Sequence, residues 1–164
     1  MEEINRILRD PDYLACLREN SRREQERIFC RHDRQHMLDV ARLAYILLLE
    51  SGQLAAVSRE RGRELCYAAG LLHDVGRWRQ YDGSGDHAQA GAELAGPILL
   101  RAGFSPAEAE LVGRAVAGHR SGGTGVLGRV LARADDLSRD CWQCRARECC
   151  YKVDRMETAA GLLR

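Results

Sequence analysis

The chain has 164 residues, with 25 Lys and Arg against 24 Asp and Glu and a net charge of +1. This balance gives no whole-domain bias toward nucleic acid or an anionic membrane, and no run of about 18 apolar residues could span a bilayer. The length predicts one domain, and the acidic residues 1–4 lack the layout of a signal peptide, so we expect a cytoplasmic protein.

Helical periodicity dominates the first third of the chain. A first helix is predicted over 11–27, with Asp10 as its N-cap, and its charged second half, 19–27, is expected on the surface. A second helix is predicted over 34–50, with an apolar stripe that His36 extends by one turn. The sequence therefore places His36 on a buried helix face.

The middle of the chain predicts a helix that ends in a histidine and an aspartate. This third helix covers 58–73 and ends at the adjacent residues His73 and Asp74. The glycine-rich segment 81–85 is typical of a loop, and a fourth helix follows over about 86–103. Adjacent residues at a helix end can converge on a small ligand such as a metal ion.

Two further helices complete the predicted fold. One begins at the N-cap Ser105 and ends at His119, and the last covers 126–137 and carries Asp135 and Asp136. No segment alternates with the period of a half-buried strand, and alanine, leucine, arginine and glutamate favour helices. The sequence predicts an all-α fold.

Histidines and carboxylates recur at the ends or on the apolar faces of these helices. A helix bundle can bind metal by aiming such side chains from several helices into one core, and both groups are good ligands for zinc, iron or manganese. The candidates in chain order are His36, His73, Asp74, His87, His119, and Asp135 or Asp136.

The order of these residues resembles the HD superfamily of metal-dependent phosphohydrolases. The resemblance covers about residues 30–140 and rests on HMLDVARLA at 36–44, LLHDVGR at 71–77 and ADDL at 134–137. It implies a compact multi-helix bundle that hydrolyses a phosphoester with a bound metal. It also favours Asp135 over Asp136 as the last ligand.

The histidines His87 and His119 are similar to two additional histidines of a dinuclear subgroup, which includes HD-GYP phosphodiesterases and bacterial diadenosine tetraphosphate hydrolases. The resemblance implies two ions, of iron, manganese or zinc, with magnesium or nickel as further options, and a bridging Asp74. It assigns the first ion to His36, His73 and Asp135, and the second to His87 and His119. The signature is not followed by Gly-Tyr-Pro, which argues against cyclic-dinucleotide hydrolysis.

Two arginines flank the candidate ligands. Arg77 follows the signature by one helical turn, and Arg120 follows His119 directly. Two metals about 3.5–4 Å apart neutralise phosphate oxygens and generate hydroxide from bound water. A guanidinium can grip the same phosphate through paired hydrogen bonds. Asp74, Arg77 and Arg120 are therefore the candidate catalytic residues.

A second His-Asp pair, His32 and Asp33, directly precedes the second predicted helix. Asp33 suits the N-cap of that helix, and we interpret the pair as lying outside the metal set.

The cysteines crowd at the C-terminal end, where four of the seven fall within 141–150. Such crowding in a reducing compartment favours metal or free thiols over disulfides. A zinc or iron–sulfur site is one interpretation, completed by His32 if the segment folds back, and ordinary reduced cysteines are the other. The residues of this possible second metal or redox cluster are Cys30, Cys141, Cys144, Cys149 and Cys150. We therefore expect one domain over 1–164, with a Cys-rich segment at 141–164.

The sequence thus predicts a metal-dependent hydrolase whose partner is a nucleotide or another small phosphoester. One alternative is a non-catalytic module that binds a nucleotide or senses metal or redox state through its cysteines. A weaker alternative is a di-iron oxygenase. We expect no membrane or strong nucleic-acid partner, and a homodimer is left open.

Overall fold

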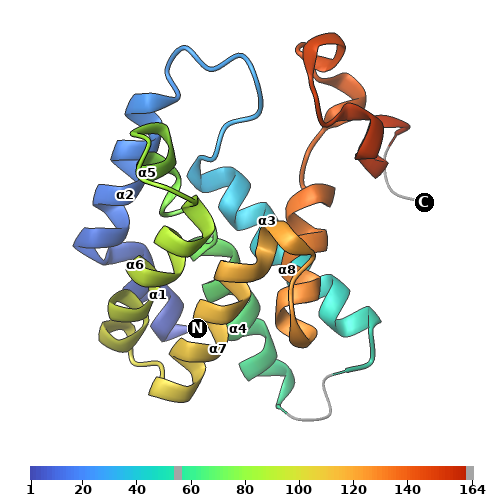
Figure 1. The fold of residues 1–164 in the computed structure, drawn as a ribbon. Coiled ribbons are helices and arrows are strands. Elements are labelled where there is room, and N and C mark those ends of the chain that lie inside the picture. Colours follow the sequence, from blue (N-terminus) through green and yellow to red (C-terminus); the bar gives the residue numbers. More distant parts are fainter. Residues whose placement is uncertain (54–56, 162–164) are drawn as a thin grey trace.

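The computed structural model describes residues 1–53 and 57–161 and folds them into a helical bundle (Figure 1). Within these residues there is no strand, so the all-α prediction is confirmed. The α-helices are α1 Glu2–Arg9, α2 Pro11–Arg23, α3 Arg34–Glu50, α4 Arg59–Leu72, α5 Arg77–Tyr81, α6 His87–Ala102, α7 Pro106–Gly118 and α8 Gly125–Leu137.

Helices α3, α4, α7 and α8 surround the core, and α6 packs along α7. Helices α3 and α4 approach so closely that a Cβ on Gly70 would lie 2.5 Å from the Cα of Ala41. This backbone contact requires glycine at position 70, and it brings the helix that carries His36 beside the helix that ends at His73. The core therefore fixes the relative position of two candidate ligands.

The predicted helix ends are largely confirmed by their caps. The side chain of Asp10 accepts hydrogen bonds from the backbone of α2, and Ser105 forms a capping box with Glu108 at the start of α7. Asp33 caps α3 by accepting a hydrogen bond from the amide of His36. Cap residues satisfy backbone amides that the helix itself leaves unpaired.

The prediction for α2 is wrong at its C-terminal end. The helix stops at Arg23 rather than Arg27, and the segment expected on the surface contains two buried polar side chains, Asn20 and Glu24. Asn20 donates to the carbonyl of Asp74 and accepts from the amide of Trp78, at 2.9 and 2.8 Å. Buried polar groups need such partners, and a charge pattern does not reveal them.

The C-terminal segment, residues 141–161, leaves α8 and folds into short 3₁₀ turns rather than helices. They are Cys141–Gln143, Arg147–Cys149, Val153–Arg155 and Glu157–Ala159, and the last packs on α8 (Figure 1, orange to red). Residues 162–164 of the predicted Cys-rich segment lie outside the described residues.

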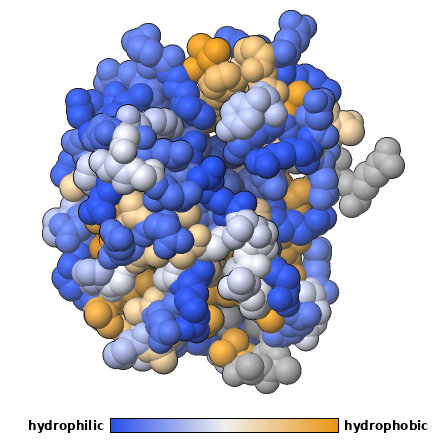
Figure 2. All heavy atoms as spheres, viewed as in Figure 1, coloured by the Kyte–Doolittle hydropathy of each residue, from blue (hydrophilic) through white to orange (hydrophobic). Residues whose placement is uncertain are grey.

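The described helices include none that is long and apolar enough to cross a membrane. Figure 2 shows that hydrophilic residues cover most of the viewed face, with hydrophobic residues in separate patches.

Candidate metal centre

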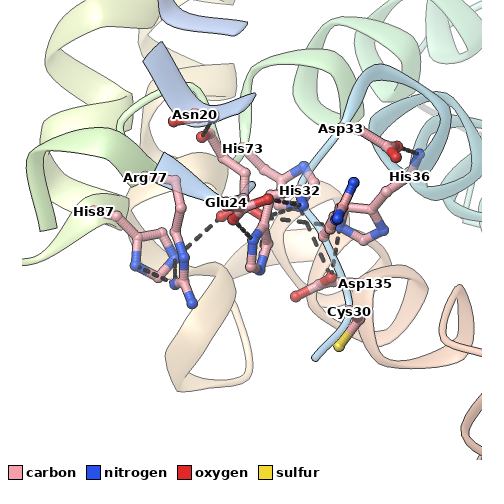
Figure 3. A network of polar contacts seen from close by, with 12 residues as sticks. Asn20, Glu24, Cys30, His32, Asp33, His36, His73, Arg77, His87 and Asp135 are labelled. Atoms are coloured by element: carbon pink, nitrogen blue, oxygen red, sulfur yellow. Dashed lines mark hydrogen bonds and ion pairs between the residues drawn. The ribbon is translucent and has the colours of Figure 1, made fainter. Parts of the chain in front are cut away.

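The carboxylate of Asp74 is the centre of the candidate site. Asp74 lies in the turn after α4 and is only 2% exposed, and all five histidines of the chain bring their Nε2 atoms within 4.0 Å of it. Figure 3 shows four of these histidines, His32, His36, His73 and His87, in one network of polar contacts. Oδ2 faces three of these nitrogens, at 3.1, 3.7 and 3.9 Å, from His73, His36 and His32. Oδ1 faces the other two, at 3.2 and 4.0 Å, from His87 and His119. The two oxygens therefore face different groups of histidines.

Four of these histidines are oriented through their other ring nitrogen. Nδ1 of His73 and of His119 each lie 2.7 Å from a backbone carbonyl, of Gly70 and Val116. A carbonyl only accepts, so both Nδ1 atoms carry the proton and both Nε2 atoms present a lone pair. Nδ1 of His87 contacts both the amide oxygen of Gln80 and the guanidinium of Arg77, so these contacts hold the ring without assigning its proton.

His36 is held in the same way by a hydroxyl. Its Nδ1 lies 3.1 Å from Oγ of Ser138, whose own proton is donated to the carbonyl of Asp135 at 2.7 Å. The hydroxyl therefore accepts from His36, and Nε2 of this ring faces Asp135 and Arg139.

Two groups of buried side chains are spaced as metal ligands. One comprises His36, His73 and Asp74, the other Asp74, His87 and His119, and within each group the ligand atoms lie within 4.8 Å of one another. Oδ1 of Asp135 joins the first group, at 3.2 Å from Nε2 of His36 and 3.8 Å from Nε2 of His73. The structure thus brings together all six predicted ligands, and its geometry favours Asp135 over Asp136.

The protonation states of both carboxylates and of His119 suit metal binding. Burial would raise the pKa of Asp74, but His73 and His32 hold that pKa well below 3.8. Burial acts likewise on Asp135, whose pKa is lowered overall by the hydrogen bond with His36 and the charge of His73. Burial, followed by the charge of His73, lowers the pKa of His119 to about 4. Burial would lower the pKa of His73, but the charge of Asp74 raises it overall. That ring must therefore lose a proton when a metal binds, because anionic carboxylates and neutral imidazoles are the forms that bind metal.

Two buried atoms at the centre lack a hydrogen-bond partner. They are Nε2 of His73, which belongs to the first ligand group, and Oδ1 of Asp74, which faces the histidines of the second group. An unpaired buried polar atom costs about 1–3 kcal/mol, and a cation beside it would remove that cost. The donor set, its protonation and these two atoms all fit divalent metal ions.

The predicted arginines lie in different places. Nη1 of Arg77 is 2.8 Å from Nδ1 of His87, so this guanidinium reaches the second ligand group. Arg120 is about half exposed and pairs with Asp86 at the rim. Arg139, which the sequence analysis did not single out, places Nη2 2.7 Å from Nε2 of His36 and 3.2 Å from Oδ1 of Asp135.

His32 lies beside the candidate centre, although neither group of spaced ligands includes it. Asp33 is the expected cap, but the buried ring of His32 faces Asp74 and is held by Glu24. Oε2 of Glu24 also accepts from the amide of His32 at 2.8 Å, and Tyr81 donates to Oε1. Helical spacing gave no signal for His32, because it precedes α3, which begins at Arg34.

The cysteine prediction stays a prediction. All seven cysteines are free thiols. Cys30, Cys141 and Cys150 line one small cavity beside His32, but no group of three cysteine ligand atoms within 4.8 Å occurs in the described part of the chain.

The chain is similar to proteins of one known family. A family model described as HD domain matches residues 34–140. An uncharacterized protein of Clostridium beijerinckii is 33% identical over 150 residues, which is 92% of each chain. No solved structure gives a significant match.

Two similar enzymes are much longer than this chain. Ribonuclease Y of Enterococcus faecalis is 32% identical over 63% of this chain, and the bifunctional uridylyltransferase/uridylyl-removing enzyme of Bradyrhizobium diazoefficiens is 39% identical over 49%. The matches span only 17% and 8% of those two proteins.

Proposed function

The chain belongs to the HD domain family, and from that premise we propose that it is a metal-dependent phosphohydrolase acting on a nucleotide or a related small phosphoester. The observation that carries this proposal is the division of the histidines between the two oxygens of Asp74. A carboxylate placed in this way suits a bridge between two cations. The similarity to ribonuclease Y, an enzyme whose name implies a phosphodiester substrate, is consistent with this chemistry.

The proposed ligand sets follow the two groups of side chains. His36, His73 and Asp135 would hold one ion, His87 and His119 the other, and Asp74 both. HD domains bind divalent metals, and such ions supply charge neutralisation and a hydroxide formed from bound water. The chain itself supplies a buried centre, the orientation of each ring through its Nδ1 partner, and a guanidinium from Arg77 beside the second set.

A polar cavity of about 440 Å³ beside the centre suits an anionic substrate. His119 and Asp135 form its inner wall, so a ligand in it would reach the proposed metals. This volume lies within the range of about 300–1,000 Å³ usual for small-molecule sites. The cationic side chains of its lining are Arg120, Arg129, Arg133, Lys152 and Arg155.

Three of these cations are available to a ligand. Arg120 pairs with Asp86, and Arg133 pairs with Glu157. Across residues 1–53 and 57–161, none of the carboxylates forms an ion pair with Arg129, Lys152 or Arg155. Unpaired cations beside a metal centre favour a substrate with phosphate groups beyond the one that reacts.

The test is hydrolysis by the manganese-loaded protein on a panel of nucleotides, dinucleoside polyphosphates and bis-p-nitrophenyl phosphate. We expect release of phosphate or a nucleoside monophosphate, reduced to background in Asp74→Asn. Asp39→Asn is the matched control, because Asp39 is a partly exposed carboxylate whose partners in the described residues are Gln35 and Arg42, away from the ligand groups. A metal-loaded protein that binds nucleotide without turnover would instead support the regulatory module, and substrate-dependent O₂ consumption the oxygenase.

A further inference from the structure

The C-terminal segment, residues 141–161, lies beside the proposed active centre but makes few stabilising contacts. Its residues Tyr151, Lys152 and Arg155 line the polar cavity of about 440 Å³. Of its residues through 161, only Ala146, Met156 and Thr158 are buried. Its ion pair between Arg133 and Glu157 is more than half exposed on both sides, and such pairs contribute about 1 kcal/mol or less. A short segment with so small a core generally needs a cross-link or a metal.

Cys141 and Cys144 occupy a tight turn. Cys141 begins the 3₁₀ turn Cys141–Gln143, and the amide of Cys144 donates to the carbonyl of Cys141 at 3.4 Å. Two cysteines separated by two residues on such a turn have the spacing of half a structural zinc site.

Two more thiols, those of Cys30 and Cys150, lie near this turn. Cys30, in the loop between α2 and α3, lines a cavity of about 40 Å³ together with Cys141 and Cys150. The pKa of the Cys141 thiol is raised, first by burial and then by the charges that Cys30, Cys144 and Cys150 would carry as thiolates. Cys30 and Cys150 thus share a cavity with Cys141, and Cys144 lies one turn away from it.

The remaining cysteines differ from these four. Cys149 is exposed and its Sγ donates to the carbonyl of Ala146 at 3.3 Å. Cys16 and Cys66 are buried in the helical core. The chain thus contains natural controls for any experiment on thiols.

We propose that Cys30, Cys141, Cys144 and Cys150 form a structural tetrathiolate site for a soft divalent cation, with zinc as the expected metal. Four thiolates in tetrahedral geometry suit zinc or iron. Binding is a proton exchange, in which one Zn²⁺ displaces four thiol protons and forms four Zn–S bonds, with no oxidant or reductant. No three of the sulfurs in the described residues lie within 4.8 Å of one another, so loading draws the C-terminal segment toward the loop that carries Cys30.

Such a site would join two parts of the candidate active centre. The loop with Cys30 also carries His32, and the C-terminal segment carries Lys152 and Arg155. The tetrathiolate site is independent of the proposed hydrolase centre in its ligands, and its test does not require a substrate.

Thiol labelling of the full-length wild-type chain, purified with reductant and zinc, tests the proposal without any variant. Iodoacetamide should modify Cys149 but spare Cys30, Cys141, Cys144 and Cys150 until a chelator removes the metal. Cys30 is exposed, so its protection requires a bound partner. Labelling of these four residues at the rate of Cys149 in zinc-containing protein, or disulfides among them in place of metal, would overturn the site.

Cobalt substitution gives a second readout. Co²⁺ bound by thiolates produces an intense sulfur-to-metal charge-transfer band, which histidine and carboxylate ligands do not produce. We expect this band in the wild type and in Cys149→Ser, and its loss in the double variant Cys141→Ser/Cys144→Ser. A reduced wild type that takes up Co²⁺ without the band would contradict the proposal, and so would a band that survives in the double variant.

Discussion

At the scale of single residues, the chemistry of the chain is concentrated around one carboxylate. Five histidines from different segments point Nε2 at Asp74, and hydrogen bonds at Nδ1 orient the rings of His36, His73, His87 and His119. His32 differs from these four because its Nδ1 contacts a carboxylate, Glu24, rather than a neutral acceptor. We therefore assign it a positioning role for Asp74 rather than a place among the proposed ligands.

Replacing His32 by asparagine tests this role. We expect unchanged metal content and an unchanged KM, with kcat reduced by about 10- to 100-fold, because partners of metal ligands typically contribute that much. Metal analysis and steady-state kinetics on the same preparation give both readouts. Asp33→Asn is the matched control, since asparagine is an equally good N-cap. Loss of metal in His32→Asn would show that His32 is itself a ligand.

The sequence predicts the six candidate ligands because they lie on periodic helices or at helix ends in a recognisable order. It does not predict the environment of His32. Glu24 lies in a highly charged run, and its burial depends on a contact with His32 eight residues away. Arg139 reaches His36 from beyond the end of α8, which no helical spacing indicates.

At the scale of helices, the site depends on close backbone contacts. A Cβ on Gly76 would lie 2.4 Å from the amide nitrogen of Gly91 and 2.6 Å from the carbonyl of His87, both in α6. Backbone atoms cannot move aside as a flexible side chain can. Gly76 therefore sets how near α6 brings His87 to Asp74.

We expect Gly76→Ala to lower the free energy of unfolding by about 1–3 kcal/mol through overpacking. It should also weaken binding of the second ion, because α6 must shift. Chemical denaturation and metal titration measure the two effects. Gly113→Ala in the neighbouring helix α7 is the control, since a Cβ there meets nothing within 4 Å, and it should stabilise by about 0.5–1 kcal/mol. Equal stability of the two variants would show that α6 can adjust freely.

A second prediction concerns the junction of α1, α4 and α7. Arg61 bonds Glu3, Glu64 and Glu108, and its bidentate hydrogen bond lowers the pKa of Glu108 from 4.5 to about 2. A carboxylate whose pKa is depressed on folding contributes stability above about pH 4.5, which is lost as the pH falls toward 2. Allowing for solvent screening, we expect Arg61→Ala to cost about 1 kcal/mol at pH 7 and to make this acid loss shallower.

Denaturation of Arg61→Ala between pH 7 and pH 2 checks the sign of this effect. Arg114→Ala is the control, since its ion pair with Glu110 is mostly exposed and should contribute within about 0.5 kcal/mol. If the free energy of unfolding of Arg61→Ala fell as steeply with acid as that of the wild type, the assignment to Glu108 would be contradicted.

The long helices could be predicted from the sequence, whereas two short ones could not. The predicted α3, α4, α6, α7 and α8 have apolar periodicity and recognisable caps. Helix α1 has eight residues and α5 only five, too few for a repeated apolar pattern. Both depend on tertiary contacts, with α1 packed on α6 and α5 packed on α2 and α6.

At the scale of the molecule, the candidate site combines a family core with an additional segment. The HD domain match ends at residue 140, whereas Lys152 and Arg155 line the cavity from beyond it. The core therefore accounts for the proposed metal chemistry, and the C-terminal segment would contribute to substrate recognition. No periodic pattern in this segment predicted where it would lie.

Removing both cations of this segment tests the division of roles. We expect Lys152→Ala/Arg155→Ala to raise KM for a substrate with several phosphates by about tenfold or more, since a charged hydrogen bond contributes about 1.5–3 kcal/mol. The kcat should remain within about twofold, because neither residue contacts the proposed ligands. Arg145→Ala, an exposed arginine of the same segment outside the cavity, should leave both constants unchanged. A fall in kcat at constant KM would contradict a role in binding.

The central claim is that Asp74 is shared by two metal ions, and the metal content of two proteins tests it most directly. Equal amounts of the wild type and of His87→Ala/His119→Ala are loaded with metal and freed of the excess. Their metal content is then measured by elemental mass spectrometry. Our account predicts one fewer ion per chain in the variant, with the ion held by His36, His73 and Asp135 retained, whatever the cysteines bind. Equal metal content in the two folded proteins would contradict it.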